Sequence, residues 1–302
     1  MDCCYLLTQL IVILSLSIIA FALKQNVFTR RKQTIKEKNG QKYVIVITGA
    51  AQGLVQDIKQ ETGIKSIEFI KVDISDPTQL LITWNSIIST HKQVNLLINN
   101  AARAIGKRFC DMQFEQFKKT IEINYFSIMQ LTKLFLDQKF LIESKEYGEY
   151  HLVNIISIAG HAASAQNSDY SGSKFALTGS FDAIRQGNKQ ISLSISKELV
   201  QDRPNVCLTN IYPYFISTGL FHGFDPKMKY IVPTLKPEYT ANRIYDSIIQ
   251  EKREVYIWWY ICYLKMVFDY FPLSLKLWIV QFTTGDGMKS FVGRDQIGKK
   301  KQ

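Results

Sequence analysis

The segment that most constrains the fold is a short apolar run that ends in a glycine-bearing turn. The run covers Tyr43–Ile47 and leads into Thr48-Gly49-Ala50-Ala51-Gln52-Gly53. A strand without polar alternation is typical of a parallel sheet that is buried on both faces. A turn of this kind before a helix lets phosphate oxygens bind backbone N–H groups at the helix N-terminus. The segment therefore predicts the first strand of a nucleotide-binding unit.

Further apolar runs alternate with helix-like sequence along the middle of the chain. We expect strands over residues 66–74, 94–98, 151–156 and 208–212, and a helix over residues 120–140. Strands that alternate with helices at this spacing indicate parallel βαβ units. The predicted fold is a single α/β domain over residues 43–253, with a doubly wound, Rossmann-like parallel sheet.

The N-terminal end has a different composition. Residues 5–23 are uncharged and mostly apolar, which is close to the length that spans a bilayer as a helix. They predict a membrane anchor over residues 1–23. The alternative is a cleaved signal peptide, because Ala20-Phe21-Ala22 resembles a cleavage site. A basic linker over residues 24–42 follows, and the positive-inside rule then places the body on the cytoplasmic side.

The C-terminal segment, residues 254–302, is hydrophobic and ends in a basic tail. Its aromatic residues are candidates for a membrane interface: Trp258, Trp259, Tyr260 and Tyr263. The alternative is a helix that packs on the body or covers a lipophilic pocket. The last residues, Lys299-Lys300-Lys301-Gln302, are similar to a dilysine retrieval signal, with a solvated tail as the alternative. We expect an endoplasmic-reticulum or lipid-droplet membrane.

Charge and cysteine usage exclude several classes of protein. The net charge is +11, but residues 24–42 and 299–301 carry most of it, so the body is nearly neutral and a nucleic-acid-binding domain is not expected. Five scattered cysteines and four unclustered histidines predict neither a disulfide framework nor a metal site.

Three residues further along the chain have a spacing that suggests proton-transfer chemistry. Ser157 ends a predicted strand, Tyr170 follows thirteen residues later, and Lys174 comes four residues after that. Residues four apart share a helix face, so the lysine ammonium can lie beneath the tyrosine hydroxyl. The ordinary pKa of a tyrosine is near 10, and a neighbouring positive charge lowers it toward the range of a useful base.

These residues, with the glycine turn and Asn99-Asn100-Ala101, make the chain resemble the short-chain dehydrogenase/reductases from about residue 43 to residue 218. The resemblance is strongest to the membrane-anchored branch of 17-beta-hydroxysteroid and retinol dehydrogenases. It implies hydride transfer between NAD or NADP and a lipophilic alcohol or its ketone or aldehyde: a steroid, a retinoid or a long-chain compound. It also suggests a homodimer.

The resemblance implies a role for each motif residue. Tyr170 is the acid/base, Ser157 donates a hydrogen bond to the substrate oxygen, and Lys174 lowers the tyrosine pKa together with the oxidised nicotinamide. Asn124 supports a water relay to the lysine, with a helix-capping or helix-breaking asparagine as the alternative. The implied cofactor-binding residues are Gly49, Gly53, Asp73, Asn100, Tyr170, Lys174 and Thr218.

The nucleotide-binding half departs from the family pattern. Val55 stands where the family has a third glycine, and only 25 residues separate Thr48 from Asp73. A single βαβ unit uses about 30 residues, so the family pattern implies that most of the first helix, the second strand and part of the next helix are deleted. The alternative is one compressed βαβ unit, with Asp73 as the ribose-binding acid. The deletion is preferred because the stretch over residues 72–76 matches a later strand of the family, and the residue that selects NAD or NADP then cannot be identified.

A second departure is an insertion at residues 186–197, where Gly187 and Asn188 should break a helix. A deletion and an insertion in one chain fit an incorrect gene model as well as true divergence. They also support a competing hypothesis: a catalytically inactive membrane or lipid-droplet protein of the same fold, with a broken cofactor site.

Overall fold

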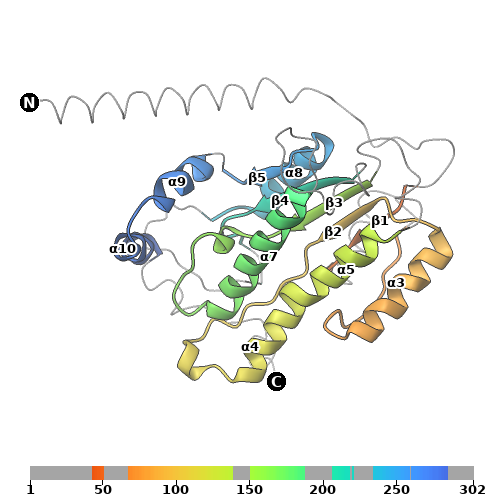
Figure 1. The fold of residues 1–302 in the computed structure, drawn as a ribbon, viewed down its shortest axis with the longest axis horizontal. Coiled ribbons are helices and arrows are strands. Elements are labelled where there is room, and N and C mark those ends of the chain that lie inside the picture. Colours follow the sequence, from red (N-terminus) through yellow and green to blue (C-terminus); the bar gives the residue numbers. More distant parts are fainter. Residues whose placement is uncertain are drawn as a thin grey trace, which may run out of the picture.

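The fold comes from a computed structural model (Figure 1). It describes residues 43–50, 67–138, 150–187, 206–217, 220, 234–258 and 260–284. The predicted anchor over residues 1–23, the linker over 24–42 and the basic tail lie outside these ranges. Within them, no helix is both long enough and apolar enough to cross a bilayer.

The centre of the described part is a parallel sheet. Its strands lie side by side in sequence order: β1 (Ile45–Ile47), β2 (Leu96–Asn99), β3 (Tyr150–Ile155), β4 (Val206–Tyr212) and β5 (Glu254–Tyr256). The predicted Rossmann-like α/β fold with a parallel sheet is confirmed. Because the order of these five strands never reverses, the described sheet extends to one side of β1 only.

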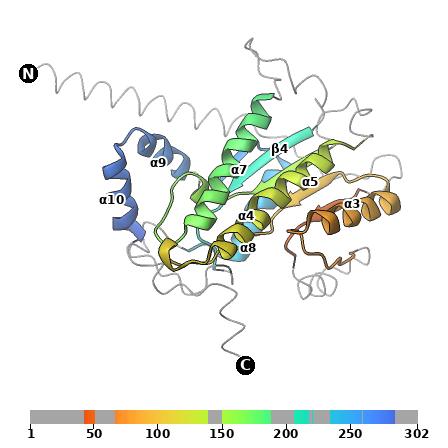
Figure 2. The ribbon, with the colours of Figure 1, turned by 60° about the horizontal axis from the view of Figure 1, so that its bottom comes forward.

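Helices cover the two faces of the sheet unequally (Figures 1 and 2). One face packs against α3 (Pro77–His91), α5 (Ser127–Leu136) and α7 (Ser168–Gly187), through side chains such as Trp84, Phe135 and Phe181. The other face packs against α8 (Pro237–Ile249), through Ile244 and Ile248. The apolar strands therefore bury both faces where β3 and β4 form the middle of the sheet.

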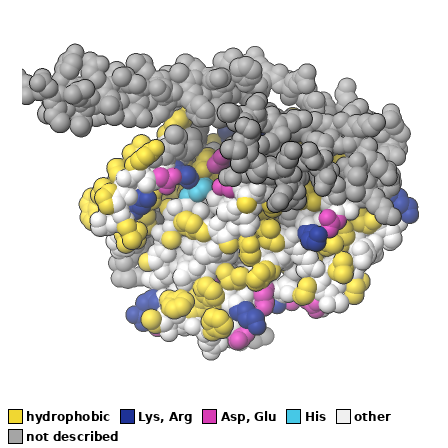
Figure 3. Space-filling view, in the orientation of Figure 1, with side chains coloured by type: hydrophobic (Ala, Val, Ile, Leu, Met, Phe, Trp, Pro, Cys, Tyr) yellow, Lys and Arg dark blue, Asp and Glu magenta, His cyan; other side chains and the backbone are white. Residues whose placement is uncertain are grey.

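Two further helices follow β5. They are α9 (Tyr260–Asp269) and α10 (Leu273–Thr284). Hydrophobic side chains gather on the surface at the end of the molecule where these helices lie (Figure 3). Pro272 separates the two helices and stands directly before α10, where its missing N–H removes no helical hydrogen bond.

Several expected elements differ from the observed ones. The strand predicted over residues 66–74 is wrong, because residues 67–73 contain no strand in the structure. The helix predicted over 120–140 begins earlier, as α4 (Phe114–Ile121), continues through a π-helical segment η2 (Glu122–Phe126), and ends as α5 at Leu136. The short strand β5 was not predicted. The helix break expected at Gly187 and Asn188 stays a prediction, because α7 is described up to Gly187 and Asn188 lies outside the described residues.

Residues 67–73 pair with no strand that the structure describes. A strand is held by hydrogen bonds to a neighbour, and in the described part of the chain β1 has a neighbour on one side only, namely β2. Ile45 and Ile47 point away from α3 and are 44% and 50% exposed, which is unusual for a parallel strand. Neither belongs to the cluster that packs against α8. Among the described residues, the sheet is thus covered on both faces around β3, and β1 is paired on one side only.

Three buried asparagines form a ladder across the sheet. Asn99, Asn154 and Asn210 occupy neighbouring positions on β2, β3 and β4, and each is 1% exposed or less. Asn99 Nδ2 donates to Asn154 Oδ1 at 2.9 Å, and Asn154 Nδ2 donates to Asn210 Oδ1 at 3.0 Å. A buried amide left without partners is costly, so the middle residue satisfies groups on both of its neighbours.

We predict that Asn154→Leu lowers the free energy of unfolding by about 2–4 kcal/mol, because it leaves polar atoms of Asn99 and Asn210 unpaired in the core. Urea denaturation measures the change. The control replaces all three asparagines with leucine. Its loss of unfolding free energy should be smaller than the sum of the losses of the three single variants, because no asparagine is left without its hydrogen-bond partner. A neutral Asn154→Leu would contradict the ladder.

Candidate active site

The candidate site is built where β3 ends. Ser157 follows this strand with φ 154° and ψ 156°, a region that residues other than glycine rarely adopt. Its Oγ accepts a hydrogen bond from the Ala159 backbone N–H at 3.1 Å and so begins the short 3₁₀ turn η3 (Ile158–Gly160). The Ile158 N–H donates to Pro213 O at 3.0 Å, which ties the turn to the end of β4. The strained backbone is therefore held from two sides.

Tyr170 and Lys174 lie one turn apart on α7, as their spacing predicted. Tyr170 is 4% exposed and Lys174 is 1% exposed. The Lys174 Nζ donates to Ile155 O at 3.1 Å and lies 5.5 Å from the centre of the Tyr170 ring. The ammonium group therefore lies between α7 and the last residue of β3, close to Ser157 in the chain.

Burial favours the neutral form of both Tyr170 and Lys174. It raises the pKa of Tyr170 to about 12, and a side-chain hydrogen bond with Ser157 acts in the opposite direction. Burial also lowers the pKa of Lys174 to about 7. The protein alone thus holds Tyr170 as a neutral phenol, which suits it to donate a proton. The lowered tyrosine pKa that we expected from the lysine does not arise from these residues by themselves.

A glycine lets the serine turn approach the helix that carries the tyrosine and the lysine. A Cβ at Gly160 would lie 2.5 Å from Thr178 Oγ1 and 2.9 Å from Lys174 O. Both distances are shorter than a real Cβ contact, and the second involves backbone that cannot easily move. Gly160 therefore sets the separation between η3 and α7, and with it the distance from Ser157 to Tyr170.

Asn124 is fully buried inside the π-helical segment η2. Its Oδ1 accepts from Arg103 N at 2.8 Å, and its Nδ2 donates to Arg103 O at 2.8 Å and to Ser173 Oγ at 3.0 Å. One side chain therefore connects the loop after β2, the η2 helix and α7 directly before Lys174. Single-turn π segments often occur at functional sites. The role of Asn124 in a water relay stays a prediction.

Two residues of this region were missed from the sequence. Asp169, directly before Tyr170, is fully buried and accepts from Ile105 N at 3.2 Å and from Thr120 Oγ1 at 3.0 Å. Ser173, directly before Lys174, donates to Tyr170 O at 2.6 Å. A small or acidic polar residue beside each motif residue was the available signal, but sequence alone does not show which way such a side chain points.

The end of β1 is joined tightly to the end of β2. Gly49 has φ 75°, and a Cβ there would lie 2.7 Å from Ala101 Cα, so the turn requires glycine. Thr48 Oγ1 accepts from Asn100 N at 3.0 Å and from Ala101 N at 3.1 Å, and Asn100 Nδ2 donates to Thr48 O at 3.0 Å. Gly49 and Asn100 therefore lie together. Gly53, Val55 and Thr218 lie outside the described residues.

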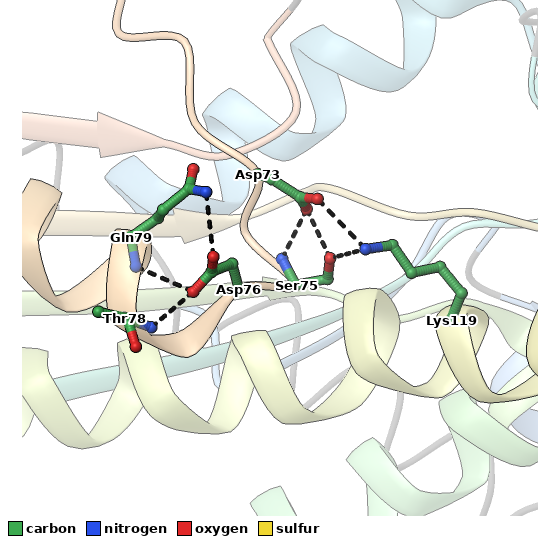
Figure 4. Close-up of polar contacts among 6 residues, drawn as sticks. All are labelled: Asp73, Ser75, Asp76, Thr78, Gln79 and Lys119. Carbon is green, nitrogen blue, oxygen red and sulfur yellow. Dashed lines mark hydrogen bonds and ion pairs between the residues drawn. The ribbon is translucent and has the colours of Figure 1, made fainter.

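Asp73 lies on the loop that leads into α3 rather than at the end of a strand (Figure 4). Its carboxylate accepts from Ser75 and forms an ion pair with Lys119 on α4 at 3.2 Å, and the hydrogen bonds from Ser75 are the main cause that lowers its pKa. Lys119 also donates to Ser75 Oγ. The next acid, Asp76, caps α3. The described contacts of the Asp73 carboxylate are thus with Ser75 and Lys119. Its contact with a cofactor stays a prediction.

The residues of the site fit a nicotinamide cofactor at one end. Burial alone lowers the pKa of the Lys174 amine, and among the described residues one of its three N–H donors is used, by Ile155 O. Such a group fits a ligand that brings hydroxyl acceptors, as a ribose does. The Gly49 turn fits a ligand that approaches the backbone closely. No aspartate or glutamate among the described residues lies at the carboxyl end of a strand, where it could bind the second ribose of the dinucleotide.

Comparison with known proteins decides the family. The sequence matches the family model described as short chain dehydrogenase over residues 37–228, more than half of the chain. The chain belongs to this family. Its members are NAD(P)-dependent oxidoreductases, so the resemblance seen in the motifs and the cofactor class are confirmed.

Individual relatives within the short-chain dehydrogenase family are distant. Human epidermal retinol dehydrogenase 2 is 26% identical over 223 residues, 74% of this chain and 67% of that protein. Short-chain dehydrogenase/reductase family 16C member 6 from Bos taurus is 28% identical over 244 residues, 72% of each chain. An alcohol dehydrogenase from Thermococcus sibiricus, solved with 5-hydroxy-NADP, has a TM-score of 0.51 at 19% identity, covering 68% of this chain and 79% of that one. The last likeness shows the shared fold.

We predict that Tyr170→Phe lowers kcat by about 10²–10⁴-fold, the usual contribution of a positioned proton donor, while NAD(P)H affinity stays nearly unchanged. The rate of reduced-nicotinamide consumption and fluorescence titration measure the two quantities. Tyr150→Phe is the matched control, because it removes a hydroxyl that bonds to Gln93 at the other end of β3. Normal turnover by Tyr170→Phe would contradict the assignment.

We also predict that Lys174→Met raises the thermal midpoint of the cofactor-free protein while it abolishes turnover. Burial lowers the pKa of Lys174 to about 7, whereas an unfolded lysine keeps a value near 10.5, so the unfolded state binds more protons between these values. The destabilisation is therefore complete at about pH 7 and below, and it fades as the pH rises toward 10.5.

The gain in thermal midpoint should accordingly be largest near neutral pH and shrink in alkaline buffer. Differential scanning fluorimetry across this pH range measures it. Lys133→Met is the control, since Lys133 is exposed and pairs with Asp137 on the surface. A gain that does not depend on pH would show that added apolar packing, rather than removal of a buried amine, causes the effect.

Proposed function

We propose that this short-chain dehydrogenase interconverts a lipophilic alcohol and its ketone or aldehyde. The observation that carries the proposal is the meeting of Ser157, Tyr170 and Lys174 at the carboxyl end of β3. Apolar side chains packed around Tyr170 support a lipophilic substrate: Ala102, Ala104, Ala159 and Leu220. The names of the relatives, which include epidermal retinol dehydrogenase 2, favour a retinoid.

The residues divide the work of proton transfer. In carbonyl reduction, Tyr170 gives its phenolic proton to the substrate oxygen, and Ser157 donates a second hydrogen bond to that oxygen. In alcohol oxidation, the proton of the substrate hydroxyl passes to the Tyr170 phenolate. Bound NAD(P) supplies the hydride chemistry and, when oxidised, a positive charge. That charge adds to Lys174, and together they oppose the raised tyrosine pKa.

A second candidate has its own support. Two observations favour a membrane or lipid-droplet protein that keeps the fold without binding a cofactor. Ile45 and Ile47 on β1 are exposed, and residues 67–73 form no strand, so that β2 is the one neighbour of β1 in the described part of the sheet. Against it stands the intact set of Ser157, Tyr170, Lys174 and Asn124, which a protein without catalysis has no need to keep.

We further propose that residues 1–23 hold the protein at an endoplasmic-reticulum or lipid-droplet membrane, with the catalytic body on the cytoplasmic side. The apolar stretch over residues 5–23 and the basic residues that follow it support this orientation. A homodimer is part of the proposal and is tested by the sedimentation mass of the detergent-solubilised protein.

Cofactor binding discriminates between the two candidate functions. We predict that the full chain in detergent binds NADH or NADPH with micromolar affinity, measured by energy transfer from tryptophan to the reduced nicotinamide. Gly49→Val should abolish binding, because its side chain would overlap Ala101. Circular dichroism must show that this variant is folded.

Screening with retinoids and steroids follows if binding is seen. A folded wild-type chain that binds neither cofactor would favour the inactive membrane protein. An unfolded wild-type chain would indicate that the segment after Gly53 lacks residues, and sequencing of the transcript would then show whether the gene model is correct.

A further inference from the structure

The surface of α10 carries exposed apolar side chains that the active site does not explain. Five large apolar side chains of this helix are at least 37% exposed: Leu273, Leu275, Leu277, Trp278 and Phe282. Val267 on α9 and Tyr270 in the turn before α10 extend the same surface. Figure 3 shows hydrophobic side chains gathered at this end of the molecule. Soluble proteins rarely leave such a contiguous group in water.

The exposed side chains do not lie on one stripe of the helix. At 3.6 residues per turn, Leu273 and Leu277 fall on one side, while Leu275, Trp278 and Phe282 fall on the other. Trp278 and Phe282 stack on each other with their ring centres 5.1 Å apart. A flat protein partner would cover one of these two sides and leave the other in water, whereas the headgroups and upper acyl chains of a bilayer can surround a helix that is apolar on two sides.

The polar groups around α10 also fit a membrane surface. The helix contains no acidic residue, and Lys276, its one basic residue, donates from Nζ to Asp269 O at 2.9 Å, beside the Phe268 ring. The amine is thus turned toward α9 and away from the apolar surface. Residues 285–302 of the sequence contain five basic and two acidic residues, which favours an anionic lipid surface.

The length of α10 limits how it can bind lipid. Its 12 residues extend about 18 Å, well short of the roughly 30 Å hydrocarbon core of a bilayer. Such a helix can lie in the interface but cannot cross it. Tryptophan is enriched at this depth because its ring is amphipathic.

We propose that α10, together with the turn at Tyr270, lies in the interfacial layer of an anionic bilayer as a membrane contact of its own, separate from residues 1–23. The proposal extends the membrane attachment proposed above. It rests on that attachment because both contacts are with the same membrane. Two contacts fix the orientation of the catalytic body on the membrane, which a single anchor followed by a long linker does not.

The test uses the full chain reconstituted in phosphatidylcholine vesicles with and without phosphatidylserine. Some of the lipid carries bromine on the acyl chains, which quenches only tryptophans that reach them. We expect a quenched, blue-shifted component in the wild type that is lost in Trp278→Phe, and stronger quenching when phosphatidylserine is present.

The control is Trp278→Phe combined with Ile82→Trp, which moves the tryptophan to an exposed site on α3. It should not restore quenching. Binding of the chain to vesicles is measured separately by flotation, so the two proposals can fail independently.

Three results would overturn the inference. If the chain floats with vesicles but Trp278 is not quenched by lipid and is quenched by aqueous acrylamide, α10 stays in water. If Trp278 is protected from both quenchers, another protein surface, such as a second copy of the chain, covers it. If the wild type does not float at all, both the membrane attachment and the α10 contact are wrong.

Discussion

The contact between α7 and the end of β3 is the interaction on which the rest of the site depends. Lys174 donates to Ile155 O from a fully buried position, and Gly160 lets the following turn approach the same helix. The same contact fixes Ser157 and Tyr170 relative to each other. Because the buried amine is destabilising by itself, its place in the core is understandable only if the site uses it.

The two halves of the sheet are unequal in a way that matters for function. The part from β2 to β5 packs against other elements on both faces, and the asparagine ladder crosses it from β2 to β4. The proton-transfer residues lie at the carboxyl end of its strand β3. In the described part of the chain, β1 has one neighbouring strand, and its Ile45 and Ile47 are exposed. The proton-transfer residues and the Gly49 turn therefore lie at parts of the described sheet that are covered to different extents, and catalysis and cofactor affinity can fail separately.

Much of this could be predicted from the sequence where local pattern determines structure. The unbroken apolar strands, the Tyr170–Lys174 spacing and the turn at Gly49 each follow from periodicity or from a single steric requirement. The strand predicted over residues 66–74 was wrong because a strand needs a hydrogen-bonded neighbour, and a local window of sequence cannot show whether the fold provides one. Among the described residues, no strand pairs with residues 67–73. The contacts of Asn124, Asp169 and the asparagine ladder depend on packing between distant segments. We expected positive charge to lower the pKa of Tyr170, but that expectation did not include burial, which raises it.

The π-helical segment at Glu122–Phe126 has a geometric consequence for the site. Such a segment holds one residue more than regular α-helical winding would, so it changes the phase between α4 and α5 by about 100°. Removing a single residue there would leave an uninterrupted helix of ordinary stability, yet it would swing Asn124 off the face that meets Arg103 and Ser173. In this segment, the number of residues determines whether the Asn124 side chain faces the site.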